Sequence, residues 1–193
     1  MPVFPFRLLP SFALFAGCLT HPVSGQPFER MELVLAGTVN VNHSPLHTFW
    51  QARPGVELSV STPFYRGRAE AGGILHPYTA RTAEVPSFSG LLLFAGWGLR
   101  VPIAPRLAVE GGARLGNYRM TFDDDTFPGL RTEHELTVAL RSTLIGRLHP
   151  NLSLYVAGNY MKSYTFIRLK LLHVSAGLRY TFRTPDWLKT FLQ

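Results

Sequence analysis

The chain has 193 residues and a formal net charge of +7, and its basic residues are 16 arginines but only three lysines. A soluble protein with a water-facing exterior normally displays far more lysine, so the composition argues against that class. The single cysteine excludes an intramolecular disulfide. No nucleic-acid recognition motif accompanies the basic charge, which argues against nucleic acid as a partner.

Residues 1–25 have the anatomy of an export signal. Arg7 precedes an apolar run from Leu8 to Leu19, and small residues follow at 23–25. Cleavage after Gly25 would leave residues 26–193, with 26–182 as one domain. An alternative remains open, because Phe15-Ala16-Gly17-Cys18 resembles a lipobox that would make Cys18 the lipidated first residue.

After the signal, apolar and polar residues alternate with a period of two, which is typical of strands with one apolar face. No apolar run there reaches the roughly 18 to 20 residues of a membrane helix, so any membrane crossing has to be made by strands. Eight strands are predicted, near 30–41, 53–62, 67–78, 90–102, 106–122, 133–148, 152–165 and 170–182.

The connections between these strands alternate in length. Short turns are expected at 63–66, 103–105 and 149–151, and longer links at 42–52, 79–89 and 123–132. A transmembrane barrel has short periplasmic turns and longer extracellular loops. The sequence therefore predicts an all-β protein, a closed antiparallel up-and-down transmembrane β-barrel of about eight strands with both termini in the periplasm.

The polar faces of the strands carry small residues and charges of both signs, which suits the narrow lumen of an eight-stranded barrel. Carboxylates enclosed in a lumen need partners, and arginine supplies several fixed donors to each. We therefore expect a lumenal charge network that plugs the pore, so that any porin-like conduction is poor. Its members are Glu32, Glu57, Glu70, Glu110, Glu135, Arg68, Arg100, Arg114, Arg141 and Arg179.

Aromatic residues gather near the predicted strand ends, as the two interfacial girdles of a membrane barrel do. The girdle near the long loops would comprise Trp50, Tyr78, Phe88, Tyr118, Phe122, Tyr164 and Phe166. The girdle near the short turns would comprise Phe64, Tyr65, Tyr180 and Phe182.

The segment 171–182, which ends in Leu178, Tyr180 and Phe182, resembles the closing strand of outer-membrane barrels. With the eight-strand pattern, the chain resembles the small OmpA/OmpX-like class. The resemblance implies that Leu178, Tyr180 and Phe182 form a signal for the barrel-assembly machinery. It also implies integral placement in the outer membrane of a Gram-negative-type bacterium, with outer-membrane lipid and lipopolysaccharide as partners.

Residues 183–193 depart from that class, whose terminal aromatic usually ends the chain. Thr184 can cap a short helix that Pro185 opens, and Trp187, Leu188, Phe191 and Leu192 would share one face. This predicts a short amphipathic tail on the periplasmic side, lying at the membrane surface or docking under the barrel.

Candidate chemistry is sparse. His173 and Ser175 share a face, as the nucleophile and base of lipid A deacylase barrels do, but Ala176 replaces the Asn of those enzymes and the pair would face the lumen. His43 with His47, and Asp123 to Asp125, are weak metal signals without further ligands, and no cofactor motif is present. The sequence therefore predicts a non-enzymatic barrel with an envelope-structural or surface-binding role. A lipid A-modifying enzyme and a soluble lipocalin-like carrier remain alternatives.

Overall fold

A computed structural model describes residues 28–42, 44–123, 132–164 and 169–192. Residues 1–27 lie outside this part of the chain, and so do the predicted signal segment and Cys18. Two short helices, α1 Leu46–Phe49 and α2 Asp186–Leu192, accompany nine strands. The strands are β1 Arg30–Asn40, β2 Trp50–Ala52, β3 Gly55–Phe64, β4 Gly67–Ala80, β5 Phe88–Ala104, β6 Leu107–Phe122, β7 Thr132–His149, β8 Leu152–Ser163 and β9 Leu169–Arg183. In the described residues, neither helix has the length and apolar character needed to cross a membrane.

The nine strands make an eight-stranded barrel, because β2 and β3 lie end to end along β4 and together occupy one position in the ring. Trp50 of β2 pairs with Ala80, and Val56 of β3 pairs with Leu75, so both strands use the same neighbour. Between them lies Pro54, which has no N–H to donate to the ladder and so interrupts it. The predicted count of eight strands around the barrel is confirmed, and the additional strand is β2, a short segment that shares the position of β3.

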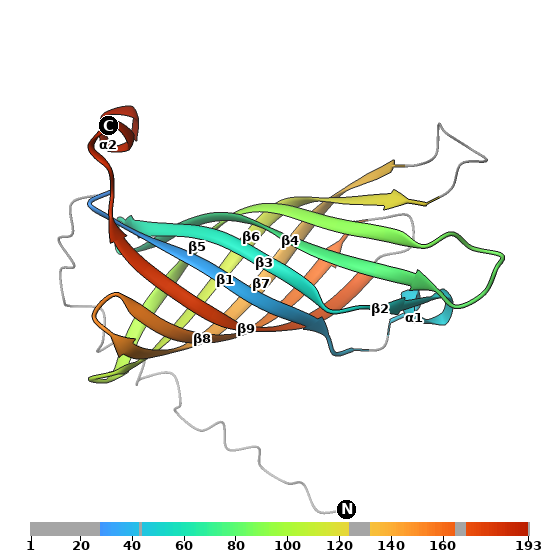
Figure 1. The fold of residues 1–193 in the computed structure, drawn as a ribbon, viewed down its shortest axis with the longest axis horizontal. Coiled ribbons are helices and arrows are strands. Elements are labelled where there is room, and N and C mark those ends of the chain that lie inside the picture. The colour runs from blue at the N-terminus through green and yellow to red at the C-terminus, as the bar shows by residue number, and fades with distance from the viewer. Residues whose placement is uncertain (1–27, 43, 124–131, 165–168, 193) are drawn as a thin grey trace, which may run out of the picture.

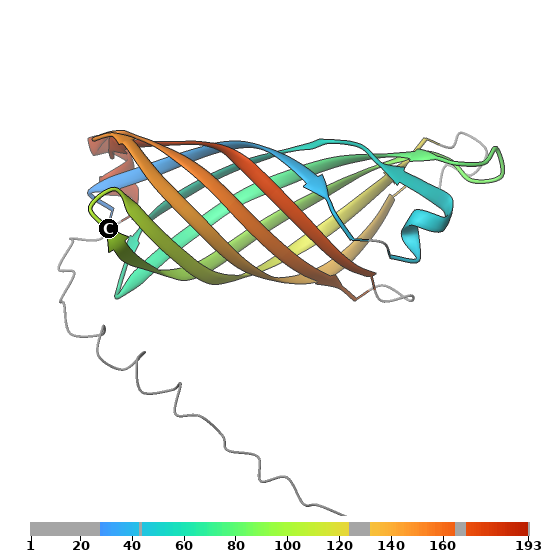
Figure 2. The same ribbon diagram turned by 90° about the horizontal axis from the view of Figure 1, so that it is seen from below.

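With β2 and β3 counted as one, strands that are consecutive in the chain are neighbours in the ring, and every pairing is antiparallel. The ring is completed where β1 meets β9, from Arg30 opposite Arg183 to Asn40 opposite His173. Figure 1 and Figure 2 show the strands winding at a steep tilt around an elongated barrel. A closed ring leaves no unpaired strand edge, which is the condition for an all-β structure in lipid.

The two ends of the barrel differ as the sequence predicts. At one end, β3 and β4, β5 and β6, and β7 and β8 are joined by two-residue turns, and β1 begins and β9 ends there. Tyr65 in the first turn has a φ of 52°, in the left-handed region. At the other end lie the longer links, of which 124–131 and 165–168 fall outside the described residues. We call these ends the turn end and the loop end.

The apolar faces point outward and the polar faces point into the lumen. Leu35 and Leu140 are 58% and 61% exposed, whereas Glu57 and Arg114 are 0% and 2% exposed. The closing strand follows the same rule, with Leu178 and Tyr180 exposed on the outside and Phe182 half-buried. An apolar outer surface around the whole ring disfavours the soluble-carrier alternative, whose exterior would be polar.

The predicted girdle near the loops is wrong for three of its members. Tyr78, Phe88 and Tyr118 lie inside the barrel, each at most 2% exposed. Their positions share the alternation phase of lumenal neighbours such as His76, so the period of two turns them inward. Trp50 and Phe122 are half-buried against the same interior cluster, while Tyr164 is exposed and Phe166 lies outside the described residues.

The predicted helix after the barrel is present as α2, at the turn end (Figure 1). Thr184 does not cap it through its side chain, because its buried hydroxyl has no hydrogen-bond partner in the part of the chain that the structure describes. Instead the carbonyl of Pro185 accepts hydrogen bonds from the backbone of Leu188 and Lys189, at 3.0 and 3.1 Å. Trp187 is exposed, and where this helix lies relative to a membrane stays a prediction.

Candidate functional site

The half of the lumen toward the turn end contains a cluster of ion pairs around Glu32. Arg100 donates two hydrogen bonds to its carboxylate, at 2.9 and 2.7 Å, in the forked geometry of arginine. Arg68 and Arg179 lie 3.1 Å from the same carboxylate. Glu110 completes the cluster, at 2.7 Å from Arg100 and 3.3 Å from Arg179.

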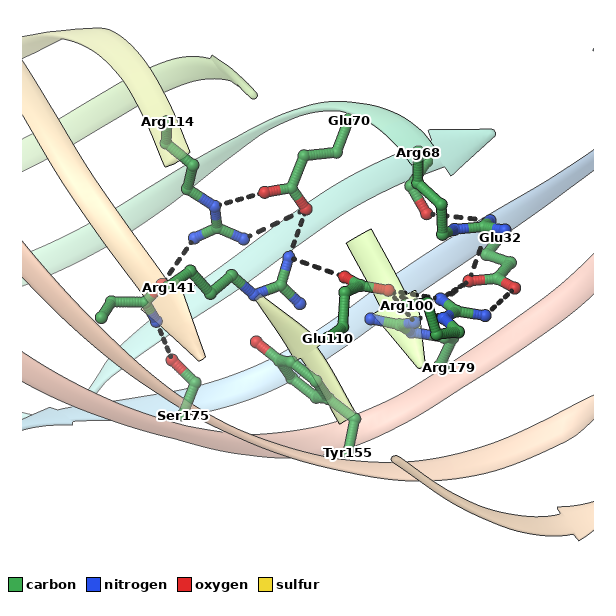
Figure 3. Close-up of polar contacts among 12 residues, drawn as sticks. Glu32, Arg68, Glu70, Arg100, Glu110, Arg114, Arg141, Tyr155, Ser175 and Arg179 are labelled. Carbon is green, nitrogen blue, oxygen red and sulfur yellow. Dashed lines mark hydrogen bonds and ion pairs between the residues drawn. The ribbon is translucent and has the colours of Figure 1, made fainter. Parts of the chain in front are cut away.

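A second cluster lies deeper in the barrel, around Arg114. This guanidinium contacts Glu57 at 2.7 Å and also pairs with Glu70, which Arg141 contacts in turn. Arg141 also lies 3.7 Å from Glu110 and so joins the two clusters into one network (Figure 3).

The contacts of the network cross the lumen. Arg100 to Glu32 joins β5 to β1, Arg114 to Glu57 joins β6 to β3, and each pair of strands is three positions apart in the ring of eight. A side chain that only lined the wall would contact the neighbouring strand. The network therefore occupies the cross-section of the barrel.

Aromatic side chains also contact the charged groups of the network. The Tyr155 hydroxyl donates a 2.8 Å hydrogen bond to Glu57, and the Phe94 ring lies 3.9 Å from the guanidinium carbon of Arg114. Beside Arg141 remains a cavity of about 10 Å³, roughly the space of one water molecule. Two guanidinium nitrogens of Arg141 have no hydrogen-bond partner among the described residues, so a water there would complete their bonding.

Of the ten predicted network residues, nine form ion pairs in the network. Glu135 does not join them: it lies at the loop end, half-buried, and has no ion pair among the described residues. Its phase on β7 is lumenal, but Arg141, the network residue on that strand, lies six residues farther toward the turn end. Tyr155 and Asn159 also belong to the network and were not among its predicted members, although both have the lumenal phase of β8.

Above the network, toward the loop end, two histidines stack. The rings of His76 and His173 have centroids 4.4 Å apart and an angle of 17° between planes. His76 contacts the Arg53 carbonyl at 3.2 Å, whereas neither ring nitrogen of His173 has a partner in the described residues. Ser175 is fully buried, and its hydroxyl accepts a 3.5 Å hydrogen bond from the Asn159 amide. His173 and Ser175 thus face the lumen, away from lipid.

The loop end of the lumen is apolar, which the sequence analysis did not foresee. Phe88 stacks on Tyr78 with centroids 4.5 Å apart, and Met120 and Leu92 pack around them. The signal was available in the sequence, because the lumenal positions of β5 and β6 change from glycine and charge to large apolar residues toward the loops.

A pocket of about 470 Å³ opens above this apolar layer, and we call it the mouth pocket. Helix α1 forms one wall through Leu46 and Phe49, and β7 brings Glu133 and Glu135 to the lining. Trp50 is fixed by a 2.7 Å hydrogen bond from its indole nitrogen to the Pro86 carbonyl. The full lining is Pro45, Leu46, Phe49, Trp50, Phe88, Met120, Phe122, Glu133, Glu135 and Leu169.

The weak metal signals gain no support in the part of the chain that the structure covers. His43, Asp124 and Asp125 lie outside it, and His47 contacts the Ser44 hydroxyl through Nδ1 at 3.1 Å. No group of three or more His, Cys, Asp or Glu side chains that could hold a metal occurs among the described residues.

Neisserial surface protein A is similar in structure to this chain, with a TM-score of 0.61 and 13% identity over 82% of this chain and 100% of that one. The chain has the fold of the small outer-membrane β-barrels. Ail of Yersinia pestis, solved with the heparin analogue sucrose octasulfate, aligns at a TM-score of 0.51 and 13% identity over 80% of this chain and 99% of its own. A designed transmembrane β-barrel gives 0.50 and 13% over 80% and 96%. No protein-family model and no curated protein matches the sequence.

Proposed function

We propose that this chain is a non-enzymatic barrel of the outer membrane, with its loop end outside the cell. Its function is to bind a small ligand in the mouth pocket. The observation that carries the proposal is the position of that pocket directly above a lumen crossed by ion pairs. A pocket above a closed cross-section is a blind site for binding rather than the entrance of a channel.

The lining of the pocket indicates the class of ligand. Its volume of about 470 Å³ falls within the range of small-molecule sites, about 300 to 1,000 Å³, and its walls are aromatic and aliphatic. Glu133 and Glu135 are the charged residues of the lining, and neither forms an ion pair within the described residues. An organic amine with an apolar body matches both features, because the ammonium group would supply the missing partner.

Conductance tests the closed lumen. In planar bilayers, the folded protein should show no stepwise ion current, because the contacts of Arg100 with Glu32 and of Arg114 with Glu57 cross the lumen. Fractionation is the companion test, and the protein should be recovered from outer membranes as a band that changes mobility on heating. Steady single-channel steps, or folded protein recovered without detergent, would contradict the proposal.

Ligand binding tests the pocket itself. The probe is 1-naphthylmethylamine, with the neutral 1-naphthalenemethanol as its matched control, and the readout is the fluorescence of Trp50 in a variant whose other two tryptophans are phenylalanine. The amine should bind better than the alcohol. Glu135→Gln should weaken amine binding by about tenfold, as loss of a charged hydrogen-bond partner does, and leave the alcohol unaffected. Equal binding of both probes would remove the assigned role of the carboxylates.

A further inference from the structure

The outward face of the barrel carries very few charges, and they are grouped. On the outward faces of the strands, the Lys and Arg side chains are Arg119 of β6, Lys162 of β8 and Lys170 of β9, all toward the loop end. His134 of β7 is the register partner of Arg119 and shares this face. No Asp or Glu occupies an outward position of these four strands in the residues that are described.

Two of the three lysines of the chain face each other directly. Lys162 and Lys170 are register partners on neighbouring strands and point to the same side of the sheet. Like charges placed opposite each other destabilise a sheet. Neither lysine forms an ion pair within the described residues, and the Lys162 ammonium lies 5.1 Å from the Tyr164 ring. The pair is therefore an uncompensated cationic site on the outside of the barrel.

Arg119 extends this site across β7. Lys162 is the register partner of Val138, and Arg119 that of His134, four residues earlier on the same strand. The separation is roughly 10 Å across the strands and 13 Å along them, a span that long Arg and Lys side chains shorten from both sides. His134 lies between Arg119 and Lys162, and its Nδ1 is 3.0 Å from Oδ1 of Asn117, which accepts the hydrogen bond.

Below these cations, toward the turn end, the same strands present an apolar surface. Leu115 of β6, Leu140 of β7, Val156 of β8 and Val174 of β9 are all exposed on the outward face. An anionic lipid in the membrane would therefore contact the apolar surface with its acyl chains and the cations with its headgroup at the same time. A soluble anion would use only the cations.

We infer that Lys162, Lys170 and Arg119 bind the phosphate groups of a phosphorylated glycolipid of the outer leaflet, of the lipid A class. The two lysines hold one phosphate between them, and Arg119 supplies a forked donor for a second. The acyl chains lie along the leucines and valines below. This site is separate from the mouth pocket, since its side chains point to the opposite face of the sheet.

The test uses the full barrel in phosphatidylcholine nanodiscs with or without bisphosphorylated lipid A. Native mass spectrometry should show lipid A retained by the wild type and about 30-fold weaker retention by Lys162→Gln/Lys170→Gln, as expected for two interfacial cations. Lys189→Gln, which removes the third lysine from helix α2, is the matched control and should retain lipid A fully. Dephosphorylated lipid A should not be retained by any variant.

A stability measurement keeps the inference testable if retention is difficult to quantify. In pure phosphatidylcholine, Lys162→Gln should raise the urea midpoint or leave it unchanged, because it relieves the like-charge pair. With lipid A present, the same variant should unfold at lower urea than the wild type. An unchanged order of midpoints in the two membranes would overturn the inference. So would sucrose octasulfate binding at these lysines in discs that fail to retain lipid A, since that would assign the site to a soluble polyanion.

Discussion

Arg114 and Glu57 contact each other at 2.7 Å across the lumen, from strands β6 and β3, with side chains that are 1% and 0% exposed. Both charged groups are removed from solvent, and the unfavourable desolvation of each is offset by its attraction to the other. Glu70 shares Arg114, so the pair is one part of a larger network rather than an isolated bridge.

The first prediction is that Arg114→Met destabilises the barrel by about 3 to 5 kcal/mol, since it leaves the carboxylate of Glu57 buried without its cation. Urea unfolding in detergent micelles measures the change. Arg106→Met is the control, because Arg106 is exposed in the turn that joins β5 to β6, and its substitution should change stability by less than about 0.5 kcal/mol. Similar midpoints for the two variants would show that the network adds little stability.

The alternation of apolar and polar residues predicts which face of a strand each side chain occupies, but it does not predict which side chains meet across the lumen. A period of two decides on which side Glu57 and Arg114 lie once one face is known to be outward, so the network was predictable as a set. The partners within it were not, because the contact between β6 and β3 depends on the ring closure and on the stagger of the strands. Glu135 shows the limit: it has the lumenal phase but the wrong height.

The aromatic residues show a second limit. Proximity to a strand end suggested a membrane girdle for Tyr78, Phe88 and Tyr118, although their phase placed them inside. The preference of aromatic rings for the interface is a tendency, whereas a one-residue change of phase would turn the whole strand over, so the phase decides. The mouth pocket could not be predicted either, since it depends on how α1 and Trp50 pack against the apolar cluster that contains Phe88 of β5.

The second prediction uses the tryptophans as reporters of the lipid face. Trp97 is 45% exposed on the outward face of β5, whereas Trp50 lies half-buried in the mouth pocket. In single-tryptophan variants, lipids brominated in their acyl chains should quench Trp97 strongly and Trp50 weakly. Stronger quenching of Trp50 than of Trp97 would mean that β5 is turned over relative to this structure.

The third prediction concerns His173 and Ser175. The serine is fully buried in the lumen, where its hydroxyl accepts a 3.5 Å hydrogen bond from Asn159, so a membrane lipid cannot approach this hydroxyl. Mass spectrometry of lipid A incubated with the protein should show no deacylation, and Ser175→Ala should cost no more than about 1 kcal/mol of stability. Deacylation that disappears in Ser175→Ala would require a lumen open to lipid and would refute the non-enzymatic proposal.

The last prediction concerns a close approach between Gly90 of β5 and Tyr118 of β6. A Cβ atom at Gly90 would lie 2.0 Å from the Tyr118 hydroxyl oxygen and 2.6 Å from Cζ, and that ring is buried in the apolar layer below the mouth pocket. Since no described glycine has a positive φ, Gly90→Ala introduces no backbone strain and its effect reports the clash alone. Overpacking of this kind costs about 1 to 3 kcal/mol.

Gly111→Ala is the matched control, because Gly111 lies on the outward face with nothing within 4 Å of the added carbon. Urea midpoints in micelles should fall for Gly90→Ala only, and Tyr118→Phe in the same chain should restore part of the loss by removing the nearest atom. Equal midpoints for the two alanine variants would mean that the Tyr118 ring is free to move aside, and that the floor of the mouth pocket is less rigidly packed than this structure indicates.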